Sequence, residues 1–337
     1  MRKIKIAQIG TTTNSHGNDI WENIKRQNDI FEIVGFAFPE NEREKFPERM
    51  KSFDGYKEYT VEEIISNSEI EAVIIETEEL YLTKYALQAA KAGKHIHMEK
   101  PGGISLRDYE ELLSIMKKTG KVFHTGYMYR YNPYVKELIE NVRKGELGEI
   151  VSVEAQMNCL HPKKLRQWLC ELPGGVMFFL GCHLVDTILQ INGQPKGITT
   201  FNTSTGVDGV TSKDFAMAVF EYENGISFLK INSNEKGGFA RRQIVVSGTK
   251  KTVEIKPLEM YPNGWDGGLF TAGNEYNDDD WLIGGKRIET ELFNRYDAMM
   301  YSFAEYVRGE KQNPYTLEYE SELYKTILKC CEVNEDV

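Results

Sequence analysis

The chain has 337 residues, of which 41% are hydrophobic and 27% charged, so it is long enough for two domains of ordinary globular composition. Its formal net charge of -10 argues against nucleic acid and anionic membrane surfaces as partners. No apolar run is long enough to cross a bilayer, and the start of the chain leads directly into an alternating strand pattern, so neither a membrane span nor a signal peptide is expected.

The five cysteines are odd in number and lack zinc-ligand spacing, which predicts reduced thiols in a cytoplasmic protein. The segment 263–281 is rich in Gly, Asn and Asp, and its Asp278-Asp279-Asp280 run lacks the spacing of a calcium loop. We therefore interpret this segment as a loop or lid, and we predict no metal site.

A strand at about 4–9, a loop from Gly10 to Gly17 and a helix to about 26 have the order of a dinucleotide-binding fold. The G-x-G-x-x-G pattern is incomplete, because Thr12 and Ser15 stand at the second and third glycine positions. Two interpretations are open: the loop binds phosphate at the helix N-terminus, or it only caps the helix. The candidate phosphate donors are Thr11, Thr12, Thr13, Ser15 and His16.

A second strand is predicted from Phe31 to about Phe38, where the fold expects an acidic residue for the ribose hydroxyls. Phe38 stands there instead and could cover one face of an adenine. Glu40 follows two residues later, and it either reaches the ribose or lies solvated at the start of the next helix.

Strands and helices continue to alternate up to residue 125. Thr60 and Glu63 have capping-box spacing, and 71–77 contains a continuous apolar run that suits a strand buried on both faces and ends at Thr77. Helices are predicted at about 81–92 and from Ser105 to Gly120, and a further strand at 122–125. This alternation predicts a doubly wound parallel sheet.

The octapeptide 94–101, Lys-His-Ile-His-Met-Glu-Lys-Pro, lies within that pattern. It is predicted to form a short strand that delivers Glu99 and Lys100 to the carboxyl edge of the sheet, where open α/β sheets bind ligands. The alternative is an ion pair that only closes a loop.

The second half of the chain changes pattern. Six strands with turn signals between them predict an antiparallel sheet, and helices are predicted at about 181–192, 295–307 and 317–333. The predicted strands are 149–157, 198–204, 215–222, 226–233, 242–247 and 252–256. The fold class is therefore α/β for the first half and α+β for the second.

Three segments carry a family resemblance. They are Glu99-Lys100-Pro101, the run Gly-Tyr-Met-Tyr-Arg-Tyr-Asn-Pro at 126–133, and the glycine pair 174–175 followed by His183 and Asp186. In these segments, and in the same order over nearly the whole chain, the sequence resembles the glucose–fructose oxidoreductase/inositol dehydrogenase (Gfo/Idh/MocA) family.

The resemblance implies a Rossmann-type dinucleotide domain at 1–125 and a substrate-binding and oligomerisation domain at 126–337, with a large open sheet. Subunit contacts through that sheet are common in the family, so a homo-oligomer, dimer or tetramer, is expected. It also implies transfer of a hydride between a nicotinamide cofactor and a secondary alcohol or ketone of a sugar, glycoside or cyclitol.

The implied catalytic residues are Lys100, which stabilises negative charge on the reacting oxygen, and His183, which acts as general base. The implied cofactor contacts are Gly10, Thr11, Thr12, Ser15, His16, Phe38, Thr77, Glu99 and Lys100. The implied substrate contacts are Tyr127, Tyr129, Arg130, His161, Trp168 and Asp186, with the tyrosines alternatively packing at the domain seam. If their segment is extended, Tyr127, Tyr129 and Tyr131 share one face.

Five residues depart from the family pattern: Thr12 and Ser15 in the glycine loop, Phe38, Leu82, and Phe179, the last of which replaces the acid that assists the histidine. They keep open a non-catalytic binding or regulatory subunit, and a relative that cleaves glycosides with a bound cofactor is a further alternative. NAD is preferred to NADP, because no arginine directly follows the second strand and Arg43 is the nearest.

Overall fold

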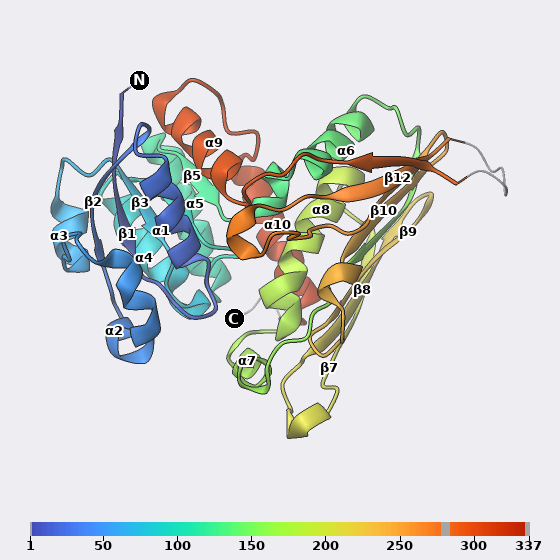
Figure 1. The fold of residues 1–337 in the computed structure, drawn as a ribbon, viewed down its shortest axis with the longest axis horizontal. Helices are drawn as coiled ribbons and strands as arrows, with labels where there is room; N and C mark the ends of the chain where they lie inside the picture. The colour runs from blue at the N-terminus through green and yellow to red at the C-terminus, as the bar shows by residue number, and fades with distance from the viewer. Residues whose placement is uncertain (1, 278–283, 334–337) are drawn as a thin grey trace. The chain divides into compact units, whose positions relative to one another are not determined.

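The computed structural model describes residues 2–277 and 284–333, and its contacts divide the chain into two compact units. Among the described residues, unit 1 runs to Tyr127 and includes Tyr296–Tyr324, whereas unit 2 contains Met128–Arg295 and residues 325–333. Figure 1 shows the elements of both units in chain colours. The predicted division at 125/126 placed 296–324 in the second domain, but their contacts group them with unit 1.

Unit 1 contains a five-stranded, wholly parallel sheet, as predicted. Its strands run in the order β2-β1-β3-β4-β5, which leaves a switch point between β1 and β3 where such sheets bind ligands. The strands are β1 (Ile4–Ile9), β2 (Phe31–Ala37), β3 (Ala72–Ile75), β4 (His95–Met98) and β5 (Phe123–Thr125).

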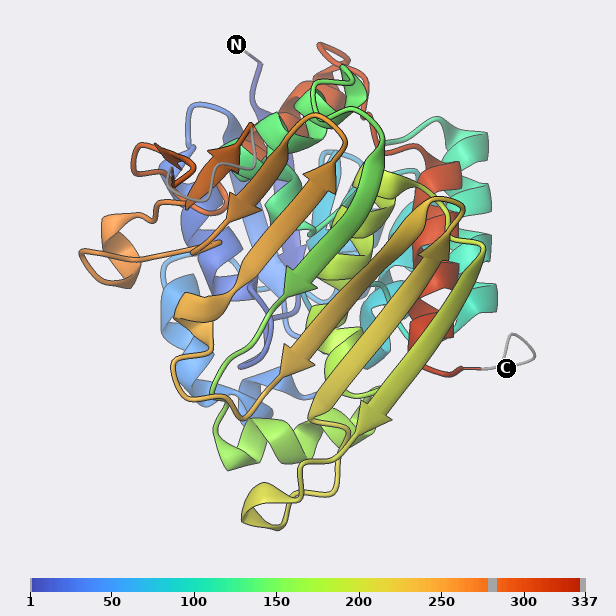
Figure 2. The same cartoon turned by 90° about the vertical axis from the view of Figure 1, so that its right-hand side faces the viewer.

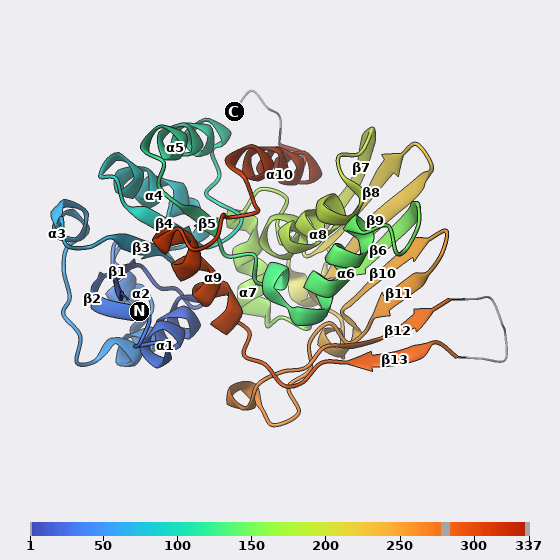
Figure 3. The ribbon, with the colours of Figure 1, turned by 90° about the horizontal axis from the view of Figure 1, so that it is seen from above.

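Helices cover both faces of this sheet, with α4 (Leu82–Lys91) and α5 (Leu106–Thr119) on one face and α1 (Gly17–Arg26) and α9 (Asp297–Arg308) on the other (Figure 3). The continuous apolar run of β3 is fully buried between these layers. Burial of each Val or Ile side chain stabilises the fold by about 1.5–3 kcal/mol, so β3 favours a position with helices packed on both faces of the sheet.

Local signals set several helix ends of unit 1. The capping box of Thr60 and Glu63 starts α3 (Val61–Ser66), and Ser105 accepts from the Asp108 amide at the start of α5. Two short elements follow β2, namely α2 (Glu42–Lys45) and η1 (Pro47–Phe53), and η2 (Glu79–Tyr81) precedes α4.

The segment 296–324 is attached to unit 1 by hydrogen bonds and stacking. Thr125 Oγ1 donates to Glu320 at 2.9 Å, and Asn313 Nδ2 donates to the Phe123 carbonyl oxygen at 2.9 Å. The ring of Tyr324, in α10 (Leu317–Cys330), stacks on Tyr109 at a centroid distance of 4.1 Å. These partners are remote in sequence, so the sequence pattern did not reveal them.

Unit 2 contains an eight-stranded open sheet in the order β13-β12-β11-β10-β6-β9-β8-β7, seen face-on in Figure 2. β6 pairs with β9 in parallel and the remaining pairs are antiparallel, so the predicted mainly antiparallel sheet is confirmed. The strands are β6 (Ile150–Gln156), β7 (Gly197–Thr203), β8 (Phe215–Tyr222), β9 (Gly225–Asn232), β10 (Gln243–Gly248), β11 (Thr252–Ile255), β12 (Ala272–Tyr276) and β13 (Lys286–Glu289).

The helices α6 (Pro133–Arg143) and α8 (Cys182–Asn192) lie along one face of this sheet (Figure 3). A short helix, α7 (Lys163–Trp168), precedes α8. No helix among residues 2–277 and 284–333 has the length and apolar character needed to cross a bilayer.

The prediction of a loop across 263–281 is wrong for residues 272–276, which form β12. This strand is rich in glycine and polar residues, and its pairing with β11 decides its structure. Its Gly273 approaches the ladder so closely that an added Cβ would lie 1.9 Å from the Glu254 carbonyl oxygen. Asp278-Asp279-Asp280 lies outside the described residues, and within them no three His, Cys, Asp or Glu side chains are placed to hold a metal ion.

Candidate functional site

The loop after β1 is bounded by two glycines that approach the end of β3. Gly10 has φ +90°, and an added Cβ there would lie 2.7 Å from the Thr77 amide nitrogen. At Gly17, the first residue of α1, an added Cβ would lie 3.1 Å from Glu76 Cβ. Gly17 therefore permits the close approach of helix to sheet that the pattern had assigned to the position of Ser15.

The side chains of this loop bind its own backbone. Thr12 Oγ1 accepts from the amides of Asn14 at 3.1 Å and Ser15 at 2.9 Å, and Ser15 Oγ accepts from the amides of Thr12 at 3.2 Å and Gly17 at 3.1 Å. The two hydroxyls thus fix the loop and occupy amides that a phosphate would otherwise meet. His16, also in this loop, contacts a residue far along the chain, because its Nδ1 lies 2.7 Å from the Tyr296 hydroxyl.

Two residues that the sequence reasoning missed lie against this loop. Glu42 of α2 is fully buried, its Oε2 accepts from the Thr11 amide at 3.0 Å, and burial raises its pKa to about 9. Arg49 of η1 donates from Nη2 to the Ser15 carbonyl oxygen at 3.4 Å, and its Nε is buried without a hydrogen-bond partner in the described part of the chain. Burial lowers the pKa of Arg49. In the sequence, these two contacts were indicated only by the presence of a glutamate and an arginine in the segment that follows β2.

A pocket of about 640 Å³ lies at the carboxyl end of β2. Glu40 lines it and accepts hydrogen bonds from Lys84 and, at 2.7 Å, from the Tyr85 hydroxyl. These two bonds hold the pKa of Glu40 below its usual value. Phe38 also lines the pocket, and Arg43 lies over its ring at 5.4 Å.

Glu99 and Lys100 lie at the carboxyl end of β4, where the sequence predicted them. Both are 2% exposed, and Lys100 Nζ lies 3.6 Å from Glu99 Oε1. Thr77, which follows β3, is buried, and its hydroxyl donates to the Glu78 carbonyl oxygen at 3.2 Å. The predicted loop after β1, Phe38 and Glu40 after β2, and Glu99 and Lys100 after β4 thus all lie at the carboxyl edge of the sheet of unit 1.

In unit 2, a π-helical turn, η5 (Met177–Gly181), leads into α8 and its buried His183. The Tyr129 ring meets the His183 ring edge-on at a centroid distance of 5.1 Å. The Tyr129 hydroxyl donates to Glu259 at 2.8 Å, and burial together with Glu259 raises the Tyr129 pKa. Burial alone would raise the Glu259 pKa, but Arg295 and Arg242 hold it below its usual value.

Arg130 and Asp186 form a buried bidentate pair. Arg130 Nε lies 3.0 Å from Asp186 Oδ2 and Arg130 Nη2 lies 2.8 Å from Oδ1, while Gln190 Nε2 donates to the same carboxylate at 2.9 Å. The carboxylate is therefore occupied within the protein and anchors the helix that carries His183. This geometry favours a positioning role for a pair that was predicted to contact substrate.

Phe179 lies in an aromatic group with two predicted substrate residues. Trp168 meets its ring edge-on at 5.5 Å, and His161 lies at 6.1 Å. His161 Nε2 lies 3.2 Å from Cys159 Sγ, and burial, with the nearby Arg242 and Arg166, lowers the His161 pKa to about 4. The position of the family's acid is thus filled by ring packing.

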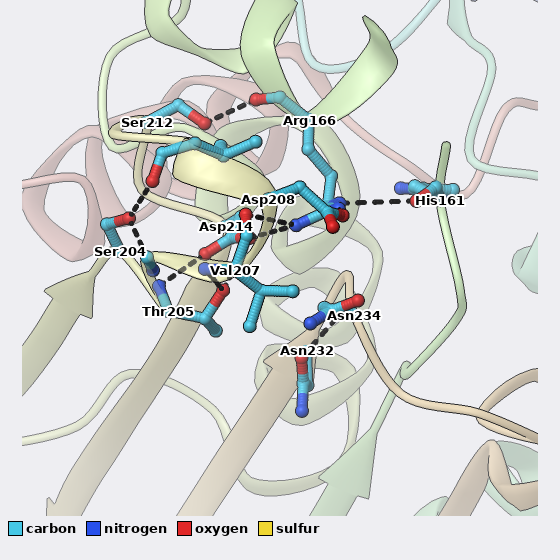
Figure 4. Close-up of polar contacts among 12 residues, drawn as sticks. His161, Arg166, Ser204, Thr205, Val207, Asp208, Ser212, Asp214, Asn232 and Asn234 are labelled. Atoms are coloured by element: carbon cyan, nitrogen blue, oxygen red, sulfur yellow. Dashed lines mark hydrogen bonds and ion pairs between the residues drawn. The ribbon is translucent and has the colours of Figure 1, made fainter. Parts of the chain in front are cut away.

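The buried guanidinium of Arg166 fixes α7, and with it Trp168. Arg166 Nε donates to the His161 carbonyl oxygen at 3.2 Å, and Nη1 lies 3.3 Å from Asp214 (Figure 4). Asp208 supplies a second carboxylate to Arg166, so the guanidinium group of Arg166 is held within the protein and has a structural role.

The tyrosines at 127, 129 and 131 do not share a face, because Met128–Tyr131 forms a 3₁₀ turn, η3, and is not extended. Tyr127 belongs to unit 1, and Tyr129 and Arg130 belong to unit 2. The condition for a shared face, an extended segment, is therefore not met, and a substrate contact of these tyrosines stays a prediction.

Two family models match the chain. Residues 4–127 match an oxidoreductase family model with an NAD-binding Rossmann fold, and residues 135–254 match the Gfo/Idh/MocA C-terminal domain. The fold and both matches define a two-domain protein of the dinucleotide-dependent oxidoreductase class. The chain belongs to the Gfo/Idh/MocA oxidoreductase family.

Curated relatives are similar at low identity. An uncharacterized oxidoreductase of Rhizobium meliloti, ORF334, is 26% identical over 60% of both chains. A 1,5-anhydro-D-fructose reductase of Ensifer adhaerens is 25% identical over 50% of this chain and 51% of its own. The scyllo-inositol 2-dehydrogenase (NADP(+)) of Bacillus subtilis is 24% identical over 66% of this chain and 61% of its own. The chain thus spans between half and about three-fifths of the length of these three relatives.

Solved structures share the fold over almost their whole length. A putative NADPH-dependent oxidoreductase of Desulfitobacterium hafniense has a TM-score of 0.79 at 20% identity, covering 98% of this chain and 95% of its own. An aldose-aldose oxidoreductase of Caulobacter crescentus, crystallised with glycerol, has a TM-score of 0.78 at 19% identity, covering 98% of both.

Proposed function

We propose that this protein is an oxidoreductase that transfers a hydride between a nicotinamide cofactor and a secondary alcohol or ketone of a sugar, glycoside or cyclitol. The observation that carries the proposal is the buried Lys100 at the carboxyl edge of the parallel sheet, beside Glu99. Family membership and the names of the sugar- and inositol-directed relatives support the substrate class.

The residues of unit 1 fit a dinucleotide. The pocket beside Phe38 and Glu40 has room for an adenosine, and the carboxylate of Glu40 is a candidate acceptor for the ribose hydroxyls. Arg49 supplies a cation beside a loop whose amides are partly used, and its unpartnered Nε suits a pyrophosphate oxygen. Lys84 pairs with Glu40 and Arg43 pairs with Glu58, so the charges of this pocket are balanced. NAD is preferred because no arginine directly follows β2, and NADP is the alternative cofactor.

The roles of the remaining residues follow from their places. Lys100 would hydrogen-bond the reacting oxygen and stabilise its developing negative charge. His183 would take the hydroxyl proton, held in position by Tyr129 and by the Arg130–Asp186 pair. The nicotinamide, when bound, supplies the hydride chemistry.

A non-catalytic binding or regulatory subunit is the second candidate, because aromatic rings surround Phe179 where the family has a carboxylate. A relative that cleaves glycosides through transient oxidation is the third, and it would share the same cofactor site. Product analysis separates the third from the first, since only cleavage splits a glycoside into two sugars.

We further propose a cytoplasmic homo-oligomer, dimer or tetramer, formed through the sheet of unit 2. The face opposite α6 and α8 carries apolar side chains, with Phe201 and Ile226 56% and 55% exposed. In the register of the sheet, Phe201 pairs with Met217, and Val219 pairs with Phe228. All five cysteines are free thiols, which suits a reducing compartment.

Calorimetric titration with NAD(H) and NADP(H), after a check for copurified nucleotide, tests the proposal. We expect NAD(H) to bind, and Arg49→Met to weaken it about tenfold or more through loss of a charge-assisted contact. Arg26→Met, which removes an exposed arginine of α1, is the matched control and should bind as the wild type does. If no dinucleotide binds at millimolar concentration, the oxidoreductase proposal fails and the non-catalytic one replaces it.

A further inference from the structure

Three buried glutamates gather with Lys100 in unit 1. Glu76 directly follows β3 and Glu99 directly follows β4, and these strands pair in register, so both carboxyl groups arrive at the same edge of the sheet. Glu79 begins η2 three residues after Glu76. The exposed fractions of Glu76 and Glu79 are 0% and 1%, and the proposed function of Lys100 uses neither.

Two of these carboxyl groups make no hydrogen bond within the described part of the chain. Both oxygens of Glu76 and both oxygens of Glu79 are buried without a hydrogen bond to any described residue. Lys100 Nζ lies 3.6 Å from Glu99 Oε1, and its positive charge also acts on Glu76 and Glu79. Burying a carboxylate that has no hydrogen-bond partner costs a large free energy. A group of neighbouring acids avoids part of this cost when some of its carboxyl groups stay protonated and therefore uncharged.

Burial gives the two groups different proton affinities. It raises the pKa of Glu79 to about 7, where Lys100 opposes the rise and Glu99 adds to it. Burial and the charge of Glu99 raise the Glu76 pKa well above its ordinary value. The two groups therefore differ in proton affinity, and Glu79 gains or loses its proton near neutral pH.

A histidine pair continues the cluster into the sheet. His97 Nε2, which has no hydrogen-bond partner in the described chain, lies 3.9 Å from Glu76 Oε1. His97 Nδ1 lies 2.7 Å from His124 Nδ1, so one proton lies between the two rings. Burial lowers the pKa of His97 to about 3, so His97 is a neutral ring that can relay a proton but does not store one.

We propose that Glu79, in the cluster with Glu76 and Glu99, is the proton acceptor of Lys100, so that proton removal does not depend on the carboxylate missing at Phe179. The inference rests on the proposed function. In this account Lys100 takes the hydroxyl proton in place of His183: the substrate O–H bond breaks as an N–H bond forms on Lys100, and at the same time another Lys100 proton passes to an ionised oxygen of Glu79. The carbon-bound hydrogen leaves as hydride to the nicotinamide, so protons and electrons balance.

The charges around the cluster come from several elements. Asp19 of α1 and Arg49 of η1 act on Glu76, and Glu78 acts on Glu79. Glu78 itself lies 2.9 Å from Lys45, outside the cluster. Glu78→Gln is therefore a matched control that removes one acid from the same segment.

Infrared difference spectra between about pH 6 and pH 8 test whether the cluster holds the proton, without any turnover. We expect the wild-type protein and Glu78→Gln to lose a buried protonated-carboxyl band across this range. In Glu79→Gln that transition should be missing, although Glu42, whose pKa is about 9, still contributes a band. Identical difference spectra of the wild type and Glu79→Gln would overturn the proposal.

The kinetics test whether the proton comes from the substrate. In the first turnover of the wild type, nicotinamide reduction should precede release of a proton to a pH indicator. In the double variant Glu76→Gln/Glu79→Gln the two should coincide, and kcat for oxidation should fall at least about tenfold near neutral pH and recover at high pH. A double variant with the wild-type profile would overturn the proposal.

The two possible failures can be distinguished. A wild-type protein that shows the infrared transition but reduces no nicotinamide refutes the proposed function, and with it this use of the cluster, although the proton-holding site itself is then established. A wild-type protein that turns over without the infrared transition refutes the cluster as acceptor and leaves the oxidoreductase intact.

Discussion

Replacing Glu79 by glutamine should make the protein more stable at neutral pH. The side chain is 1% exposed, and its carboxyl pKa is about 7 in the folded protein against an ordinary value of 4.5. Because the folded pKa is raised, the unfolded chain releases this proton first as the pH rises. Below pH 4.5 the Glu79 carboxyl group therefore does not lower the free energy of unfolding. As the pH rises from 4.5 to 7 it lowers this free energy progressively, and above pH 7 the loss is constant.

The magnitude follows from the difference of about 2.5 between 7 and 4.5. Each pKa unit corresponds to about 1.4 kcal/mol, so the folded protein loses about 3 kcal/mol between these pH values. Glutamine keeps the shape and does not titrate. The free energy of unfolding of Glu79→Gln minus that of the wild type should rise by about this amount across the same range.

Urea unfolding curves at half-unit pH intervals measure this difference. All other groups, Glu76 included, are present in both proteins and cancel to first order. A pH-independent difference between the variant and the wild type would refute the argument that Glu79 is buried and protonated. Glu78→Gln, with its carboxyl group beside Lys45, should show no comparable trend.

Three further predictions concern Lys100, the Arg130–Asp186 pair and the sheet of unit 2. Lys100→Met should abolish turnover with an unchanged circular dichroism spectrum, and a near-wild-type kcat would remove Lys100 from the chemistry. Asp186→Asn should lower the free energy of unfolding by about 3–5 kcal/mol, because it leaves Arg130 buried without its carboxylate. Glu111→Gln, at an exposed ion pair, should change that free energy by less than about 1 kcal/mol, and equal losses would contradict the assignment. Phe201→Glu should shift light scattering from oligomer towards monomer, and a wild type that is monomeric at micromolar concentration would contradict the proposed interface.

The sequence by itself determined the elements whose signals are local. The apolar run of β3, the capping box of Thr60 and the alternation of strands and helices specify a parallel sheet without reference to remote partners. The Glu-Lys-Pro segment was placed at the carboxyl edge of that sheet for the same reason, because a short strand ends directly before it.

The tertiary structure decided what depends on partners far along the chain. The side-chain amide of Asn132, at the start of α6, reaches Thr271, and Thr125 finds Glu320 in a helix predicted to belong to the other domain. The pairing of Arg130 with Asp186 and the burial of Glu42 against Thr11 likewise carry no local signal. Periodicity shows which face of an element is buried, but a buried charge or a polar strand is stable only because of the particular group that meets it, and only the folded chain brings that group there.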